Sequence, residues 1–517
     1  MIPGYPDRYR RPSRTECSVG KPRRMKISKS KFVAGVQCLK RLYLQVHEPE
    51  LTEQSDGADE TPFEQGHEVG LLARELFPGG IEVDSSVGLS QAIRATKELV
   101  ANPEVPAIFE GAFESHDVIV KTDILQRRKD NLWRLVEVKS TADLKEHHLE
   151  DVAIQSYVLS HSALNLASVW LAHVNRAYVL TGTTVDPRQF FLLRNLTRRV
   201  QNLQPALTFQ LRSQFRVLAM PTAPDLPTGP HCTNPVTCEF FDHCNHPKSD
   251  DHIGFLPRLH ASAAEQLEEM GVESVHDIPA DFELSEIQRR ACDTMQTGQP
   301  WFSTDLKGEF ESLKYPLCFM DFETINPAIP RFPGMHPYDH LPFQWSVHLQ
   351  AQPGVAPEHF EFLAMDGGDP RLAFISSLCE ALNEHGNIVV YNEQFESQRL
   401  WELAGWLPEY TQRIRDIQCR LWDLLPVVRK HVYHPAFGGS FSLKAVLPAL
   451  VPEMTYEGME VPNGQAAGLA WQAMIAENSS AAERQAKRKA LLDYCEQDTL
   501  AMVRLLEALQ NAAPPKP

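Results

Sequence analysis

Two sets of strand-like apolar runs, each followed by helical patterns, constrain the fold of this chain more than any other feature. The first set covers residues 106–113, 117–126, 132–139 and 167–180, with a helix at about 145–163 before its last member. The second set begins at Leu317 and continues through 387–391, with helices between and after its strands. Prolines clustered in 221–230 end regular structure between the two sets. The sequence therefore predicts a multi-domain α/β protein, and 517 residues at roughly 150 per domain suggest about three domains.

The composition of each segment sets the expected domain boundaries. Residues 1–24, rich in Arg, Pro, Ser and Gly, are expected to form a disordered tail, and residues 511–517 a second short tail. The two α/β domains are expected over 25–250 and 313–510. Residues 251–312 are expected to be a helical linker, whose helix, glycine turn at Gly271 and second helix resemble a helix-hairpin-helix that grips a nucleic-acid backbone. A plain inter-domain spacer is the alternative.

The balance of charges narrows the class of protein. The chain carries 67 Asp and Glu against 50 Lys and Arg, a formal net charge of −17. This balance argues against a histone-like protein that holds nucleic acid by bulk positive charge, but it allows an enzyme with acidic metal sites. No run of about 18 apolar residues is present, and arginines occupy the N-terminus where a secretory segment would be apolar. We therefore expect a soluble, cytoplasmic protein with no membrane partner.

A predicted hairpin carries the first candidate site. The polar turn around Asp130 joins the apolar runs 118–125 and 132–139, and a hairpin centred there places Asp123 opposite Glu137. Because side chains alternate along a strand, Glu137 and Lys139 point to the same face. Two carboxylates with a lysine suit Mg²⁺ or Mn²⁺ and the charge that develops on a phosphate. An edge hairpin with a cross-strand salt bridge is the structural alternative.

This arrangement resembles the RecB-like branch of the PD-(D/E)xK nucleases, which have a restriction-endonuclease-like α/β core. In this resemblance Asp123 stands at the metal-binding aspartate, and Glu137 and Lys139 stand at the (D/E)xK motif. The resemblance implies that His67, on the preceding helix, is a further metal ligand, and Glu110 matches the acidic position before the aspartate strand. Gln155 and Tyr157 match substrate-binding positions of the following helix, but they are two residues apart where the family has four.

Four cysteines form the second candidate site. Cys232, Cys238 and Cys244 recur every six residues in a polar segment, far from Cys38 in the chain. These gaps match neither a zinc finger nor a zinc ribbon, whereas four thiolates are the usual complement of an iron–sulfur cluster. One cysteine before the nuclease core and three after it also resemble the same RecB-like branch, and this resemblance implies a [4Fe–4S] cluster. Four-coordinate zinc and four unrelated thiols remain the alternatives.

Acidic residues at three places in the second half form the third candidate site. Asp321 and Glu323 lie on one face of a strand, and Tyr494 and Asp498 lie four apart on one face of a helix. Asn392 and Glu396 follow the strand at 387–391. Together these motifs resemble the DEDDy branch of the DnaQ-like 3′–5′ exonucleases, on a ribonuclease-H-like fold.

The DEDDy resemblance implies a role for each of these residues. Asp321, Glu323, Glu396 and Asp498 would be the metal ligands, and Tyr494 would orient the attacking water. Asn392 would contact the substrate. Glu396 stands where the family has aspartate, so its carboxylate reaches one methylene further. A degenerate domain that binds nucleic acid without cleaving it is the alternative.

The combination resembles the predicted RecB-family nucleases that carry such a C-terminal domain. The sequence therefore predicts a metal-dependent nuclease that acts on DNA, with single strands or ends as substrate, in repair, recombination or defence. The expected cofactors are a [4Fe–4S] cluster and Mg²⁺ or Mn²⁺. An exonuclease that processes RNA, and a nucleic-acid-binding scaffold with inactive sites, are the competing interpretations.

Overall fold

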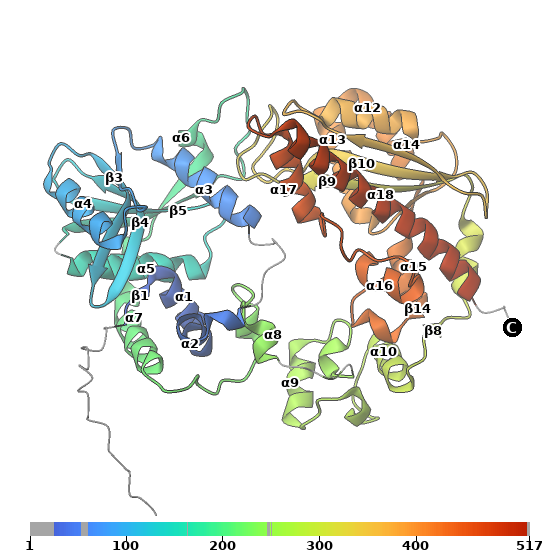
Figure 1. Cartoon of the computed structure of the whole chain (residues 1–517), viewed down its shortest axis with the longest axis horizontal. Helices are drawn as coiled ribbons and strands as arrows, with labels where there is room; N and C mark the ends of the chain where they lie inside the picture. The colour runs from blue at the N-terminus through green and yellow to red at the C-terminus, as the bar shows by residue number, and fades with distance from the viewer. Residues whose placement is uncertain (1–24, 53–59, 163, 246–248, 250, 514–517) are drawn as a thin grey trace, which may run out of the picture.

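The chain folds into two α/β lobes that lie side by side (Figure 1). The computed structural model describes residues 25–52, 60–162, 164–245, 249 and 251–513, and no side chains at 60–63. The tail predicted over 1–24 and most of the short tail at 511–517 lie outside the described residues. The predicted multi-domain α/β class is confirmed.

The N-terminal lobe is built on a seven-stranded mixed sheet. Its strand order is β2-β3-β4-β5-β6-β7, and β1 pairs in parallel with the start of β4. The strands are β1 (Ile27–Ser28), β2 (Ile81–Glu82), β3 (Ala107–Ser115), β4 (Val118–Arg127), β5 (Trp133–Lys139), β6 (Leu166–Val174) and β7 (Phe191–Asn195). The helices are α1 (Lys29–Gln37), α2 (Leu39–His47), α3 (Glu60–Arg74), α4 (Leu89–Ala101), α5 (Glu146–His161), α6 (Pro187–Phe190), α7 (Thr197–Leu218) and α8 (Phe241–Cys244).

Two apolar clusters hold this sheet between helices. Side chains of α1, α4, α5 and α7 pack in one cluster with Val120 and Leu135, whereas α3 packs in another with Ile124 and Val136. The alternation of these strand residues explains why β4 and β5 are apolar on both sides. Helices thus cover both faces of the sheet, except at the polar side chains of Asp123 on β4 and of Glu137 and Lys139 on β5.

The predicted hairpin register is confirmed. Ile124 pairs with Val136 and Leu125 with Leu135, as a turn centred on Asp130 requires. Asn131, in the turn, has a φ of 61°, a left-handed conformation that asparagine tolerates better than most residues. This register brings Asp123 beside the end of β5, where its Oδ2 accepts a hydrogen bond from the Val138 backbone N–H at 2.7 Å.

The C-terminal lobe has a five-stranded mixed sheet with the order β11-β10-β9-β12-β13. Neighbouring strands are antiparallel from β11 to β9 and parallel from β9 to β13. The strands are β9 (Leu317–Ile325), β10 (Leu341–Gln350), β11 (Glu358–Leu363), β12 (Ile388–Val390) and β13 (Leu421–Asp423). The helices are α12 (Arg371–Ala381), α13 (Glu393–Trp406), α14 (Thr411–Gln418), α15 (Leu424–His431), α16 (Leu443–Leu450), α17 (Gly464–Ile475) and α18 (Ala481–Ala512).

Helices cover both faces of this second sheet. Apolar residues of α12, α13 and α14 pack with Met320 and Phe322, whereas α15, α16 and the end of α18 pack with Leu317 and Phe319. Such a helix–sheet–helix arrangement is compatible with the predicted ribonuclease-H-like domain. It also places α18 over β9, so that residues far apart in the sequence become neighbours (Figure 1).

The segment at 251–312 belongs to the C-terminal lobe and is not a free spacer. Its elements are α9 (Ala261–Glu269), α10 (Glu286–Thr297), β8 (Trp301–Phe302) and α11 (Leu306–Glu309), and β8 pairs with β14 (Val432–Tyr433). Val275, Ala291 and Leu306 are fully buried in the core of the C-terminal lobe. The second helix of the expected helix-hairpin-helix is only the 3₁₀ turn Val275–Asp277. Residues 265–286 carry acids and no Lys or Arg, which weighs against a contact with phosphates.

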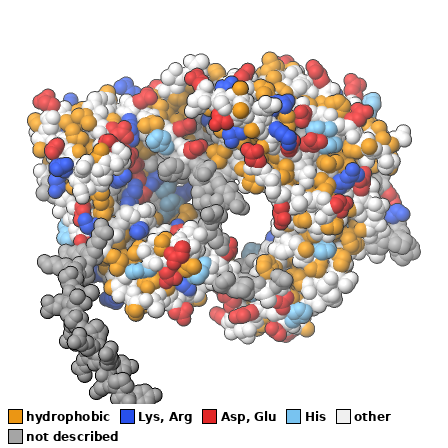
Figure 2. Space-filling view, viewed as in Figure 1, with side chains coloured by type: hydrophobic (Ala, Val, Ile, Leu, Met, Phe, Trp, Pro, Cys, Tyr) orange, Lys and Arg blue, Asp and Glu red, His pale blue; other side chains and the backbone are white. Residues whose placement is uncertain are grey.

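The lobes also meet directly, away from this connecting segment. Leu180 of the N-terminal lobe exchanges backbone hydrogen bonds with Met335 (3.0 Å) and Gly334 (2.7 Å) of the C-terminal lobe. Ala328 packs in the apolar cluster that contains Val69. Joined at two places, the lobes leave a central opening in the space-filling view (Figure 2). Within the described part of the chain, none of the helices is long and apolar enough to cross a membrane.

Candidate functional site

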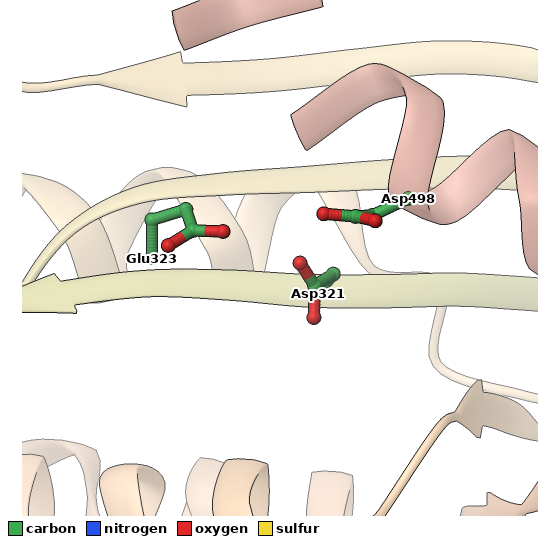
Figure 3. A group of neighbouring side chains, drawn as sticks. All are labelled: Asp321, Glu323 and Asp498. Carbon is green, nitrogen blue, oxygen red and sulfur yellow. The ribbon is translucent and has the colours of Figure 1, made fainter. Parts of the chain in front are cut away.

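Three carboxylates converge in the C-terminal lobe. Asp321 and Glu323 project from the same face of β9, and Asp498 faces them from α18 (Figure 3). One ligand oxygen from each lies within 4.8 Å of the others, and these are the only three such residues within the described part of the chain. The structure therefore brings together acidic residues that the sequence places on a strand and on a distant helix.

The local structure explains how the acids reach this position. Strand alternation turns Asp321 and Glu323 away from the apolar Met320 and Phe322. Gly464, at the start of α17, lets that helix approach, because a Cβ there would stand 3.1 Å from Glu323 Oε2. A side chain at this position would crowd the carboxylate or displace α17.

Two further side chains lie beside the three carboxylates, and the sequence analysis predicted neither of them. Lys444 Nζ, from α16, donates a hydrogen bond to the Tyr494 hydroxyl at 3.2 Å. The Tyr456 hydroxyl donates to Asp498 Oδ1 at 2.6 Å. Neither residue lies in a motif, so no local signal distinguishes them from other lysines and tyrosines. Tyr494 is only 4% exposed, and it lies on the same side of α18 as Asp498.

Glu396 lies near Asp321 but outside the trio. It is buried, and its Oε2 has no hydrogen-bond partner among the described residues. A buried carboxylate oxygen without a partner is costly unless a cation or water satisfies it. Asn392, predicted to contact substrate, is exposed at the start of α13 with a φ of 92°, and its backbone N–H donates to Asp423 at 2.9 Å.

The electrostatics of this site fit a divalent cation. Burial, followed by repulsion from neighbouring acids, raises the pKa of Asp321 and Glu323 well above their usual values. Burial also raises the pKa of Asp498 to about 6, although hydrogen bonds from Tyr456 and Tyr494 lower it. Three buried acids and the half-buried Asp321, with one nearby ammonium group, are stable as carboxylates only with added positive charge. Mg²⁺ and Mn²⁺ prefer such oxygen ligands.

These pKa directions predict that Mn²⁺ binding strengthens as pH rises. Each raised pKa means that the metal-free site holds protons, and these must leave before the oxygens can bind an ion. Without metal, the same groups favour the folded state below their unfolded pKa, and this stability is lost as pH rises through the folded value of about 6 for Asp498. We therefore expect Mn²⁺ to raise the melting temperature more at about pH 7.5 than at about pH 5.

Thermal melts and titration calorimetry over this pH range check the prediction. Asp498→Asn should remove most of the pH-dependent stabilisation while keeping the shape of the side chain. A Mn²⁺ effect of equal size at both pH values, or one that survives Asp498→Asn, would contradict it.

The N-terminal candidate site is a compact network of opposite charges. Glu137 is 1% exposed, and its Oε1 accepts hydrogen bonds from Lys139 Nζ at 2.9 Å and from Lys29 Nζ at 3.1 Å. Asp151, on α5, pairs with both lysines. Burial raises the pKa of Glu137, but the two ammonium groups outweigh burial and hold that pKa well below its usual range.

Asp123 completes this network as a third carboxylate. Burial and the neighbouring Glu137 raise its pKa to about 7. Lys29 and Asp151 were missed by sequence analysis. Asp151 precedes Gln155 by one helical turn, a spacing that could have indicated it, whereas Lys29 reaches the site only because α1 packs near α5.

Two residues that the sequence places at the N-terminal site, His67 and Glu110, stand outside this charged network, although the strand register sets Glu110 beside Asp123. His67 is exposed on α3, and within the described residues it belongs to no group of three ligand atoms close enough to share an ion. The role of His67 as a metal ligand stays a prediction. Glu110 forms an ion pair with Arg74 at 3.2 Å, at an irregularity of β3 where its φ is 54°.

The structure separates the two residues that were predicted to bind substrate on α5. Gln155 is fully buried, and its Nε2 donates to Glu137 Oε2 at 2.6 Å, so it orients a carboxylate and does not face a substrate. The Tyr157 ring contacts the rings of His116 and His161 at a tilt, on another side of the helix. The spacing of two residues explains this outcome, because it turns a helical side chain by about 200°.

The four cysteines surround a single pocket. Cys38 lies at the break between α1 and α2, and the other three come from 232–244, yet all four line the same space. Cys38 Sγ accepts the Arg41 backbone N–H, and Cys232 Sγ accepts that of Gly229, both at 3.5 Å. Burial raises the pKa of Cys238 to about 11, so its thiolate needs a positive partner.

The spread of the sulfur atoms bears on the identity of that partner. In tetrahedral zinc the sulfurs stand about 3.8 Å apart, as Zn–S bonds of about 2.3 Å require. No three of these four Sγ atoms, all within the described residues, lie within 4.8 Å of one another. A four-iron cluster holds its thiolates further apart, because each sulfur binds a different iron. Four thiols around one pocket are a donor set that suits either an iron–sulfur cluster or a four-coordinate zinc ion.

Part of the chain is similar to other proteins. Residues 318–442, which contain Asp321, Glu323 and Glu396, are similar to the domain of unknown function DUF2779. Over 220 residues the chain is 25% identical to "Uncharacterized protein MG366 homolog" of Mycoplasma pneumoniae (strain ATCC 29342 / M129 / Subtype 1), with coverage of 38% of this chain and 33% of that protein. Over 175 residues it is 23% identical to "Uncharacterized protein UU173" of Ureaplasma parvum serovar 3, with coverage of 30% and 25%.

The chain therefore spans about a third or less of the length of these curated relatives. A solved structure described as "Crystal structure of SSO0001" matches 40% of this chain and 90% of its own, at 12% identity. Its TM-score of 0.16 is too low to carry any argument about the fold.

Proposed function

We propose that this chain is a metal-dependent nuclease, and that its C-terminal site hydrolyses phosphodiester bonds at 3′ ends. One observation carries the proposal: Asp321, Glu323 and Asp498 converge beside the buried Glu396, with a buried tyrosine against them. Divalent ions bound there would polarise the phosphate and activate a water.

The residues of the chain have distinct parts in this proposal. Asp321, Glu323 and Asp498 would hold the metal, and Glu396 would hold a second ion through its unpartnered oxygen. Burial and the neighbouring acids raise the pKa of Tyr494, so its phenol keeps its proton and can donate a hydrogen bond to an attacking water. Lys444 would hold the Tyr494 hydroxyl in place.

The N-terminal network supports a second nuclease site in the same proposal. Asp123 and Glu137 would bind a metal ion, and Lys139 would stabilise the charge that develops on the phosphate. Two of its three carboxylates, those of Glu137 and Asp151, are already paired with the two ammonium groups, so this site attracts a cation less strongly than the C-terminal one. Lys29 would have to move from Glu137 Oε1 when a metal binds.

The remaining parts of the proposal concern the cofactor and the substrate. Cys38, Cys232, Cys238 and Cys244 would hold a [4Fe–4S] cluster, which would tie α1 and α2 to the segment after α7. DNA with single-stranded ends is the proposed substrate, in repair, recombination or defence within the cytoplasm. RNA is the competing substrate, and a scaffold without activity is the competing class.

Degradation of end-labelled single strands tests the proposal directly. The full-length chain is incubated with DNA and RNA oligonucleotides that have free 3′ ends, with Mg²⁺ or Mn²⁺ and with EDTA as control. We expect stepwise shortening from the 3′ end of DNA, blocked by EDTA. Faster shortening of RNA would favour the RNA-processing alternative, and binding without cleavage would favour the scaffold.

Lys139→Ala tests the N-terminal site separately. A circular single strand has no 3′ end, so its cleavage reports this site alone. We expect Lys139→Ala to slow that cleavage by roughly 10²-fold, because a positioned charge is lost from the transition state. Trimming of linear strands should persist. The exposed Lys121→Ala serves as control, and equal rates for both variants would show the network to be structural.

A further inference from the structure

A cavity of about 670 Å³ lies between the two lobes. The N-terminal lobe lines it with the loop that follows β5, including Ser140, Thr141 and Lys145, and the C-terminal lobe contributes Glu323, Arg331 and Phe395. One end of the cavity is therefore formed by Ser140, which follows Lys139 of the N-terminal site in the sequence. The other end is formed by Glu323, a carboxylate of the C-terminal site. Its volume is that of an ordinary small-molecule site.

Tyr338, also in the cavity wall, has the features of a residue held for a ligand. Its φ is 66°, a left-handed conformation that is rare for a bulky side chain. Its backbone N–H donates to the Pro327 carbonyl at 2.9 Å, and its ring packs against the apolar cluster of the N-terminal lobe. Its hydroxyl is buried without a hydrogen-bond partner among the described residues. Burial raises its pKa to about 12, so the hydroxyl remains a donor at neutral pH.

The side chains of the cavity match the parts of a nucleotide. Lys145 and Arg331 supply positive charge from opposite lobes, which suits a phosphate, although Glu68, Asp143 and Glu323 also line the cavity and make its wall acidic on balance. The ring of Phe395 offers a surface on which a base can stack. Arg331 is oriented by the Gln472 amide oxygen, also in the wall. The acidic end at Glu323 is where the proposed metal would bind.

We propose that this cavity binds a single-stranded nucleic acid that contacts both lobes at once. The N-terminal lobe would hold the strand, and the 3′ end of the same strand would enter the C-terminal site. The proposal rests on the proposed nuclease function. Backbone hydrogen bonds between Leu180 and residues 334–335 fix the lobes against each other, so the shape of the cavity persists between encounters with substrate. The substrate site of the C-terminal nuclease is therefore incomplete without the N-terminal lobe.

Three substitutions in the full-length chain test this inference. Tyr338→Phe removes only a hydroxyl that bonds to nothing in the protein, so it should leave the melting temperature unchanged. Lys145→Ala and Arg331→Ala remove one charge from each lobe. Trimming of a 5′-fluorescein oligothymidylate is measured in a Lys139→Ala background, where only the C-terminal site cleaves. Exposed residues outside the cavity give the controls Lys121→Ala and Arg212→Ala.

We expect each cavity substitution to raise KM by about tenfold with little change in kcat, the size expected for one lost hydrogen bond to a charged phosphate. Unchanged KM for all three variants, with normal trimming by the parent, would overturn the inference and leave the proposed function standing.

Fluorescence anisotropy separates the two proposals if the chain cleaves nothing. The same oligothymidylate is then titrated with Asp498→Asn protein, with and without each cavity substitution. Binding that Tyr338→Phe and Lys145→Ala weaken would keep the cavity as a strand site although nuclease function fails. No binding, or equal binding by all variants and controls, would overturn both.

Discussion

Asp498→Asn is expected to slow 3′-end trimming by about 10³-fold or more, the largest kinetic effect of any single change in this chain. The substitution keeps the side-chain volume and an oxygen that can accept the Tyr456 hydroxyl, but it removes the negative charge that an ion would need. Because one carboxylate oxygen of each acid lies within 4.8 Å of the others, loss of one ligand affects the whole set. Rates are measured with labelled linear strands at saturating Mn²⁺.

Asp493→Asn is the matched control for this experiment. Asp493 lies on the same helix but is exposed, and it pairs with Lys489 one turn earlier. We expect its trimming rate to stay within about twofold of the parent, as for ordinary surface changes. Equal rates for Asp498→Asn and Asp493→Asn would identify the C-terminal lobe as a binding domain without catalysis.

Cys238→Ser is expected to remove the proposed iron–sulfur cluster and to destabilise the N-terminal lobe. Protein purified without oxygen should be brown with broad visible absorbance, and the variant should lose this colour. Its melting temperature should fall by roughly 10 °C or more, because bound metal contributes directly to folding free energy. The effect should be large because Arg41 and Gln45 bind Glu239, so α2 depends on the order of the cysteine segment.

Cys419→Ser is the control, since Cys419 is exposed and distant in sequence from the four clustered cysteines. It should retain colour and stability. Iron and sulfide analysis of both variants completes the measurement. Colourless parent protein with one equivalent of zinc would contradict the proposed cluster and favour the four-coordinate alternative.

Local sequence determined the elements that carry the candidate sites. Alternation of apolar residues predicted β4, β5 and β9, and the turn at Asp130 predicted the pairing of Ile124 with Val136. These features depend on neighbours in the chain, where side-chain direction and turn geometry follow fixed rules. The spacing of Tyr494 and Asp498 also set their common face of α18 for the same reason.

Only the tertiary structure decided which charged groups meet. Lys29, Asp151, Lys444 and Tyr456 reach their sites through helix packing, which no short pattern encodes. His67 shows the reverse case, because its place on α3 leaves it exposed although the motif matched. The resemblance to known families predicted which types of residue form each site. The rotation and position of each helix determined which side chains lie there.

The relation between the lobes was likewise absent from the sequence pattern. Residues 251–312 have the short helical patterns expected of a helical linker, yet Val275 and Ala291 are buried in the C-terminal core. Tyr338 and Thr141 share a cavity although nearly two hundred residues separate them. Sequence periodicity indicates which face of each helix or strand is apolar. It therefore predicted that the chain forms two α/β domains. It does not report which apolar faces meet, so the packing of the lobes and the cavity between them were decided by the complementary shapes of surfaces that form only after folding.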